Sequence, residues 1–141
     1  GDNVREAEVI DLVMSALQEG GISIIAHSPK VGPTRKFQTD LAIWSDEFNS
    51  WIGNPLLIEV KIFTQRQRRI DDLVERVLAY LQPGTARSAL ILYIGEPLSL
   101  PQDFPNIFYM EVRELFTKLR TKSFAQILTD MRNRRVHGIE A

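Results

Sequence analysis

The sequence predicts an α/β fold in which helices flank a mixed β-sheet, in the order α-β-β-β-α-β-β-α. Apolar residues recur at helical spacing near the N-terminus and again between residues 65 and 82, and apolar runs of strand length lie around them. The chain has 141 residues, of which 44% are hydrophobic, enough to bury a core without disulfides or metals. We therefore expect residues 1–141 to form a single domain, one that a longer protein could contain.

The N-terminal segment has the pattern of an amphipathic helix followed by a short strand. Ile10, Val13, Met14 and Leu17 form one apolar stripe, so a helix is expected over residues 4–17, ending at Gly20-Gly21. The short apolar run at residues 22–26 then predicts the first strand.

Two further strands are expected on either side of a polar loop. Residues 36–44 alternate between apolar and polar side chains, which is typical of a strand. Residues 45–55 form the polar loop, and residues 56–63 form a second, largely apolar strand. In that strand Leu56, Ile58, Val60 and Ile62 share one face, and the intervening residues share the other.

The second half of the chain predicts helices alternating with buried strands. Residues 65–82 form a long helix with Ile70, Leu73, Val74, Val77 and Leu81 facing inward, ended by Pro83-Gly84. Residues 89–94 are apolar throughout, as in a strand covered on both faces. A last strand is expected over residues 106–112, followed by one or two helices, the second capped by Ser123.

Composition excludes several kinds of site. The chain has no cysteine, so disulfides, thiolate zinc sites and thiol nucleophiles are excluded, and two histidines are too few for a His-rich metal site. No apolar run reaches the roughly 20 residues of a membrane span, and no signal peptide is visible, so we expect a cytoplasmic protein with no membrane contact. Residues 1–59 carry four basic and nine acidic side chains, whereas residues 60–141 carry 13 basic and nine acidic ones.

Two charged residues interrupt the apolar strand at 56–63. Glu59 and Lys61 are two positions apart and so project from the same face. If the preceding loop forms a hairpin centred between Asn49 and Ser50, Asp40 lies opposite Glu59 and points to the same face. The sequence therefore predicts that Asp40, Glu59 and Lys61 converge.

Two carboxylates beside an ammonium suit hydrolysis of a phosphodiester. Mg²⁺ prefers oxygen ligands and keeps several waters, and a bound metal activates one of those waters. A nearby ammonium can orient that water and stabilise the developing charge. The alternative is a structural Glu-Lys pair at the surface of an unrelated α/β interaction domain.

These residues resemble a known motif. Asp40 in Gln-Thr-Asp-Leu-Ala-Ile-Trp, followed by Glu59-Val60-Lys61 in Leu-Leu-Ile-Glu-Val-Lys-Ile-Phe, is similar to the PD-(D/E)XK nuclease superfamily, in the manner of its Mrr-like or Holliday-junction-resolvase-like branch. The order of elements resembles that of the superfamily over about residues 4–112. The chain departs from the motif at Thr39, where Pro is usual, and in its longer hairpin loop.

The resemblance implies a restriction-endonuclease-like fold and roles for individual residues. Asp40, Glu59 and the main-chain carbonyl of Val60 would hold Mg²⁺ or Mn²⁺, and Lys61 would position the attacking water. The superfamily also carries a glutamate on its first helix. By helical phase Glu6 lies near the centre of the apolar stripe and Glu8 nearly opposite it, so Glu6 is preferred as the catalytic acid while Glu8 stays open.

The function expected from the resemblance is metal-dependent hydrolysis of nucleic acid, most readily DNA, by an endonuclease-like domain. Lys36, Arg66, Arg68 and Arg69 are the candidate phosphate contacts, and a basic C-terminal segment around Arg132, Arg134 and Arg135 is a weaker one. The alternative is a catalytically silent domain of this fold that binds nucleic acid or a protein partner. The oligomeric state stays open, with a homodimer as one option.

Overall fold

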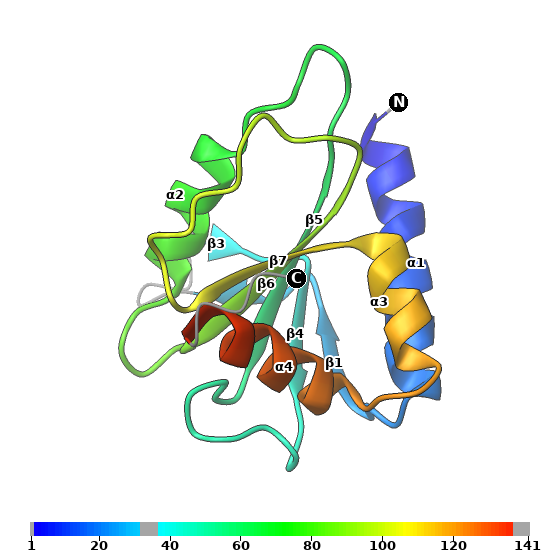
Figure 1. The fold of residues 1–141 in the computed structure, drawn as a ribbon, viewed down its shortest axis with the longest axis vertical. Coiled ribbons are helices and arrows are strands. Elements are labelled where there is room, and N and C mark those ends of the chain that lie inside the picture. The colour runs from blue at the N-terminus through cyan, green and yellow to red at the C-terminus, as the bar shows by residue number, and fades with distance from the viewer. Residues whose placement is uncertain (1, 32–36, 137–141) are drawn as a thin grey trace.

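A five-stranded mixed sheet forms the centre of the computed structural model, which describes residues 2–31 and 37–136 (Figure 1). The strand order is β1-β4-β5-β6-β7. The strands are β1 (Ile24–His27), β4 (Leu41–Trp44), β5 (Leu56–Ile62), β6 (Ser88–Ile94) and β7 (Ile107–Glu111). β1, β4 and β5 pair antiparallel, whereas β5, β6 and β7 pair parallel. The predicted mixed sheet is confirmed.

Helices cover both faces of the sheet. On one face α1 (Asp2–Glu19), α3 (Val112–Leu119) and α4 (Phe124–Val136) share a core with Leu56, Ile58 and Val60 of β5. On the other face α2 (Asp71–Tyr80) packs against Leu57 and its neighbours (Figure 1). α1 ends before Gly20-Gly21 as expected, and the Gln126 N–H donates to Ser123 Oγ (3.2 Å), which confirms the predicted cap of α4. Every described helix is too short or too polar to span a bilayer.

The prediction of one continuous strand over residues 36–44 is wrong. Residues Phe37–Gln38 form β3, which pairs with β2 (Lys30–Val31) in a separate two-stranded ribbon, and only β4 joins the main sheet. The chain turns at Thr39 because its hydroxyl donates to the Ile58 carbonyl (3.1 Å) and its N–H donates to the Pro29 carbonyl (3.2 Å). Side-chain bonding thus replaces the strand ladder at this point.

The prediction of a helix over residues 65–82 is also wrong in its first turns, since α2 begins at Asp71. Thr64 and Gln67 exchange backbone hydrogen bonds of 3.0 and 3.2 Å, which closes a tight turn. Arg68 then donates from Nε to the Glu96 carbonyl (2.9 Å) and accepts from the Leu98 N–H (2.9 Å). The loop over residues 64–70 is therefore held by a distant segment, and the helix starts where Asp71 and Asp72 favour its N-terminus.

The hairpin of β4 and β5 has the register expected from the sequence. Leu41 pairs with Ile58, which sets position 40 against position 59. The connecting loop, predicted to be polar, inserts Phe48 and Ile52 into the core. The Ser88 hydroxyl at the start of β6 also donates to the Ile52 carbonyl (2.6 Å). Anchoring to the core and to β6 explains how a long loop keeps one register.

Gly95 permits the close approach of the chain after β5 to the end of β6. Its φ is +95°, and a Cβ at this position would lie 2.5 Å from the Phe63 carbonyl oxygen. The Phe63 N–H in turn donates to the Ile94 carbonyl (2.7 Å). A side chain at Gly95 would therefore both strain the backbone and separate the two segments.

We predict that Gly95→Ala lowers the free energy of unfolding by about 2 kcal/mol or more, because backbone strain and a steric clash add. Gly84→Ala is the matched control: Gly84 has φ +86° but nothing lies within 4 Å of the added Cβ, so only strain applies. Urea unfolding of both variants measures the difference. Equal losses would contradict the contribution of the Phe63 contact.

Candidate active site

The candidate site lies where β4 separates from β5. β4 begins at Leu41, so β5 has no strand partner on this edge beyond Ile58. The Val60 N–H instead donates to Asp40 Oδ2 at 2.7 Å. Because the N–H and C=O of one strand residue point to the same side, the Val60 carbonyl faces this edge as well. This hydrogen bond thus brings Asp40 to the main chain of Val60.

Glu6 occupies the next position along the same edge of β5. The Ile62 N–H donates to Glu6 Oε1 at 3.4 Å, so the first helix reaches the strand two residues beyond Asp40's contact. Glu6 is partly buried, whereas Glu8 is exposed. The helical phase that favoured Glu6 over Glu8 therefore agrees with the side chain that the structure turns toward β5.

Glu59 is buried on the face of the sheet covered by α2. Its side chain is 6% exposed, and Oε1 is buried without a hydrogen-bond partner among the described residues. Burial, and then the negative charge of Asp40, raise the pKa of Glu59 from 4.5 to about 8, against a smaller opposing effect of Thr39. The two carboxyl groups predicted to converge therefore interact electrostatically.

Lys61 follows Glu59 on the same face of β5 and stands in register with Tyr93 on β6. It is partly exposed, and its ammonium makes no hydrogen bond or ion pair with residues 2–31 or 37–136. The Lys61 ammonium is therefore available to a ligand.

Sequence reasoning missed Tyr80 and the role of Thr39. Tyr80 is 2% exposed, and its hydroxyl donates to the Gln38 carbonyl at 3.3 Å. Burial, followed by the charges of Glu59 and Asp40, raises the pKa of Tyr80, with Arg76 opposing, which places its phenol beside the carboxyl pair. Helical spacing was the available signal, because Tyr80 lies three residues after Val77 and seven after Leu73, both of which are buried. Leu81, expected from the sequence to face inward, is only partly buried.

The candidate phosphate contacts differ in how free their side chains are. Arg66 is exposed on the loop after β5. Arg68 is bound to the Glu96 carbonyl, and Arg69 donates to Asp71 Oδ2 at 2.8 and 3.2 Å. Lys36 lies outside the described residues. Of the three described arginines, Arg66 is therefore the one whose side chain is not engaged by another residue.

The C-terminal arginines contribute to packing. Arg132 lies over the ring of Trp51 (4.5 Å to the centroid) and Arg135 over that of Phe108 (5.1 Å). Arg135 also donates from a terminal nitrogen to the Phe104 carbonyl (3.0 Å). These contacts hold α4 against the hairpin loop and β7.

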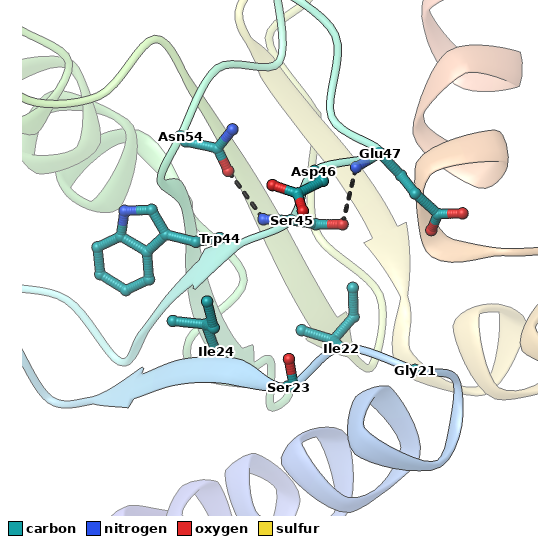
Figure 2. A pocket seen from close by; sticks show the side chains of 9 residues that line it. All are labelled: Gly21, Ile22, Ser23, Ile24, Trp44, Ser45, Asp46, Glu47 and Asn54. Carbon is teal, nitrogen blue, oxygen red and sulfur yellow. Dashed lines mark hydrogen bonds between the residues drawn. The ribbon is translucent and has the colours of Figure 1, made fainter.

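A cavity of about 670 Å³ lies at the opposite end of β4 from Asp40 (Figure 2). Its lining includes Ile24, Trp44 and Asp46. Figure 2 shows the Ser45 N–H donating to Asn54 Oδ1 (2.9 Å) and the Glu47 N–H donating to Ser45 Oγ (3.2 Å). The lining contains none of the candidate catalytic residues, so the cavity does not mark the candidate active site.

The donor set fits a hard cation in part. Among the described residues, no three acidic or histidine side chains form a group able to hold a metal ion, so Glu6 does not complete a three-carboxylate cluster. The smaller set of Asp40, Glu59 and the Val60 carbonyl provides oxygens only, and the partnerless Glu59 Oε1 is the atom a cation would satisfy.

No family model, curated protein or solved structure matches this chain. The interpretation of the site therefore rests on its own residues.

We predict that Glu59→Gln makes the metal-free protein more stable at high pH. Folding raises the pKa of Glu59 from 4.5 to about 8, so the folded state binds the proton more tightly than the unfolded state. The stability that this proton contributes is fully present below pH 4.5 and is lost as the pH rises through 8. The amide cannot ionise, so above pH 8 the variant should gain on the order of a few kcal/mol relative to wild type. Urea unfolding in EDTA across this range tests it, and a difference independent of pH would contradict it.

Proposed function

We propose that this chain is a metal-dependent nuclease whose centre is formed by Asp40, Glu59 and Lys61. The supporting observation is the buried Glu59 Oε1, which finds no hydrogen-bond partner in the described part of the chain although the Asp40 carboxyl group acts on it. A buried, unsatisfied polar atom is costly unless a ligand supplies its partner. A divalent cation between Asp40 and Glu59 would supply it and would neutralise their repulsion.

Each residue has a distinct task in the proposed reaction. Mg²⁺ or Mn²⁺, when bound, lowers the pKa of a ligated water and neutralises charge on the phosphoryl group. Asp40 is held in place by the Val60 N–H, and the carbonyl of Val60 points toward the same edge as a further ligand. The Lys61 ammonium forms no ion pair with the described residues, so it would be free to orient the attacking water and stabilise charge on the phosphoryl group.

The proposed substrate is nucleic acid, and DNA in the first instance. The net charge of −1 gives no general attraction to a polyanion, so binding depends on local cations such as Arg66. A cytoplasmic location belongs to the same proposal.

We predict different effects for the carboxylates and the lysine. Asp40→Ala and Glu59→Ala should abolish Mn²⁺ binding measured by calorimetry, because each removes a ligand. Lys61→Ala should keep metal binding but slow cleavage at least about 10²-fold, and Lys61→Arg should not restore it because a planar fork differs from a compact ammonium.

Asp46→Ala, which removes an exposed acid at the far end of β4, is the control and should change neither measurement. Unchanged Mn²⁺ affinity in both carboxylate variants would refute the site. Cleavage by Lys61→Ala at the wild-type rate would assign the chemistry to other residues.

The two glutamates of α1 provide a matched pair. We predict that Glu6→Ala slows cleavage at least about tenfold, because it releases the Ile62 N–H and removes a charge from the edge of β5. Glu8→Ala removes an equal charge from an exposed position and should have no effect. Single-turnover cleavage rates compare them, and equal effects would exclude a specific role for Glu6.

A second candidate function is nucleic-acid binding without catalysis. It is favoured by the lack of a three-carboxylate group in the described part of the chain. Duplex, single-stranded and branched DNA incubated with Mg²⁺, Mn²⁺ or EDTA distinguish the two. Binding with no metal-dependent cleavage of any substrate would favour this second function.

A further inference from the structure

The side of α2 next to the candidate site carries Arg76, which forms no ion pair with the described residues. Arg76 and Tyr80 are four residues apart, so their directions around the helix differ by only about 40°. Tyr80 is buried with its hydroxyl on the Gln38 carbonyl, two residues before Asp40. Arg76 therefore projects from the flank that faces the site, whereas Glu75 lies about 140° from Tyr80, toward solvent.

Arg76 is held near the site by the packing of its own helix. Val77, the next residue, is fully buried against the sheet in the same cluster as Leu57 and Ile91. Ile91 is the register partner of Glu59, so this turn of α2 packs over the part of the sheet that carries the buried carboxyl group.

The guanidinium of Arg76 is exposed and forms no ion pair or hydrogen bond with the described residues, although Asp72 precedes it by four positions. Its charge nevertheless reaches the site. Burial raises the pKa of both Glu59 and Tyr80, and the positive charge of Arg76 opposes the rise in each. Arg76 is thus close enough to both groups for its charge to act on them.

We propose that Arg76 binds a backbone phosphate of the nucleic acid, so that the substrate strand passes between Arg76 on α2 and Lys61 on β5. This inference rests on the proposed function and names the path of its substrate. A guanidinium fork matches phosphate oxygens in a bidentate manner. Arg68 and Arg69 are less suited, because their guanidinium groups already bind Glu96 and Asp71.

The position also has an electrostatic purpose. Asp40 and Glu59 would repel an approaching phosphate. Among the described arginines on the loop after β5, only Arg66 has a side chain without a hydrogen bond or ion pair. An arginine beside the carboxyl pair offsets that repulsion where the phosphate must come closest. The contact would position the substrate without taking part in proton transfer.

The test compares Arg76→Ala and Arg76→Lys with Arg120→Ala, all in the Lys61→Ala background so that cleavage does not interfere. Arg120 is an exposed arginine at the end of α3, on the opposite face of the sheet. Affinity for a short duplex DNA is measured from low to moderate salt in the presence of Mg²⁺. Thermal unfolding of each variant is recorded alongside.

Arg76→Ala should weaken binding about tenfold and reduce the salt slope by about one, with no change in thermal unfolding. Arg76→Lys should keep the slope but recover only part of the affinity, because it keeps the charge and loses the fork. Arg120→Ala should change neither quantity.

Three results are decisive. Wild-type affinity and slope in Arg76→Ala would overturn this inference, while loss of cleavage in Asp40→Ala would still support the proposed function. Weaker binding with an unchanged slope would also overturn it, because a lost phosphate contact must change the slope. The expected loss of slope, together with no DNA cleavage by the wild-type protein, would support the Arg76 contact and refute the nuclease.

Discussion

The hydrogen bond from the Val60 N–H to Asp40 Oδ2 is the interaction on which the site depends. The backbone N–H and C=O groups of a buried strand need hydrogen-bond partners, and the pairing of β5 with β4 ends at Ile58. Asp40 replaces that neighbour with a side chain, and Glu6 does the same for Ile62. Beyond Ile58, side chains therefore take the place of the β4 strand as hydrogen-bond acceptors. This arrangement sets the carboxylates of Asp40 and Glu6 along the edge of β5 and leaves the Val60 carbonyl facing them.

Glu59 shows the cost of this arrangement. A carboxyl group with an unsatisfied oxygen lies among apolar side chains, next to a second acid. The packing does not require an acid at position 59, since Leu57 on the same face of β5 is fully buried and apolar. The two hydrophobic clusters on either side of the sheet provide the stability that offsets it. Local instability supported by a well-packed surrounding is typical of functional positions.

Features fixed by strand alternation or helical rotation could be predicted from the sequence. The opposition of positions 40 and 59 and the preference for Glu6 are of this kind, because each follows from a regular geometry. The break at Thr39 and the loop held by Arg68 could not be predicted, since both depend on hydrogen bonds to distant segments. Alternating polarity in residues 36–44 is compatible with one strand or with two. The hydrogen bond of Thr39 to Ile58 determines that the chain forms two.

The order of the parts along the chain has a consequence for synthesis. Glu6, Asp40, Glu59 and Lys61 all precede the end of β5, whereas the elements that bury Glu59, α2 and β6, come after it. β6 pairs with β5 across 32 positions, from Leu56 to Ser88. While the chain emerges from the ribosome, the carboxyl groups are therefore hydrated and the hairpin can form without enclosing them. Enclosure of the site therefore requires the parallel half of the sheet, which is synthesised after the site residues.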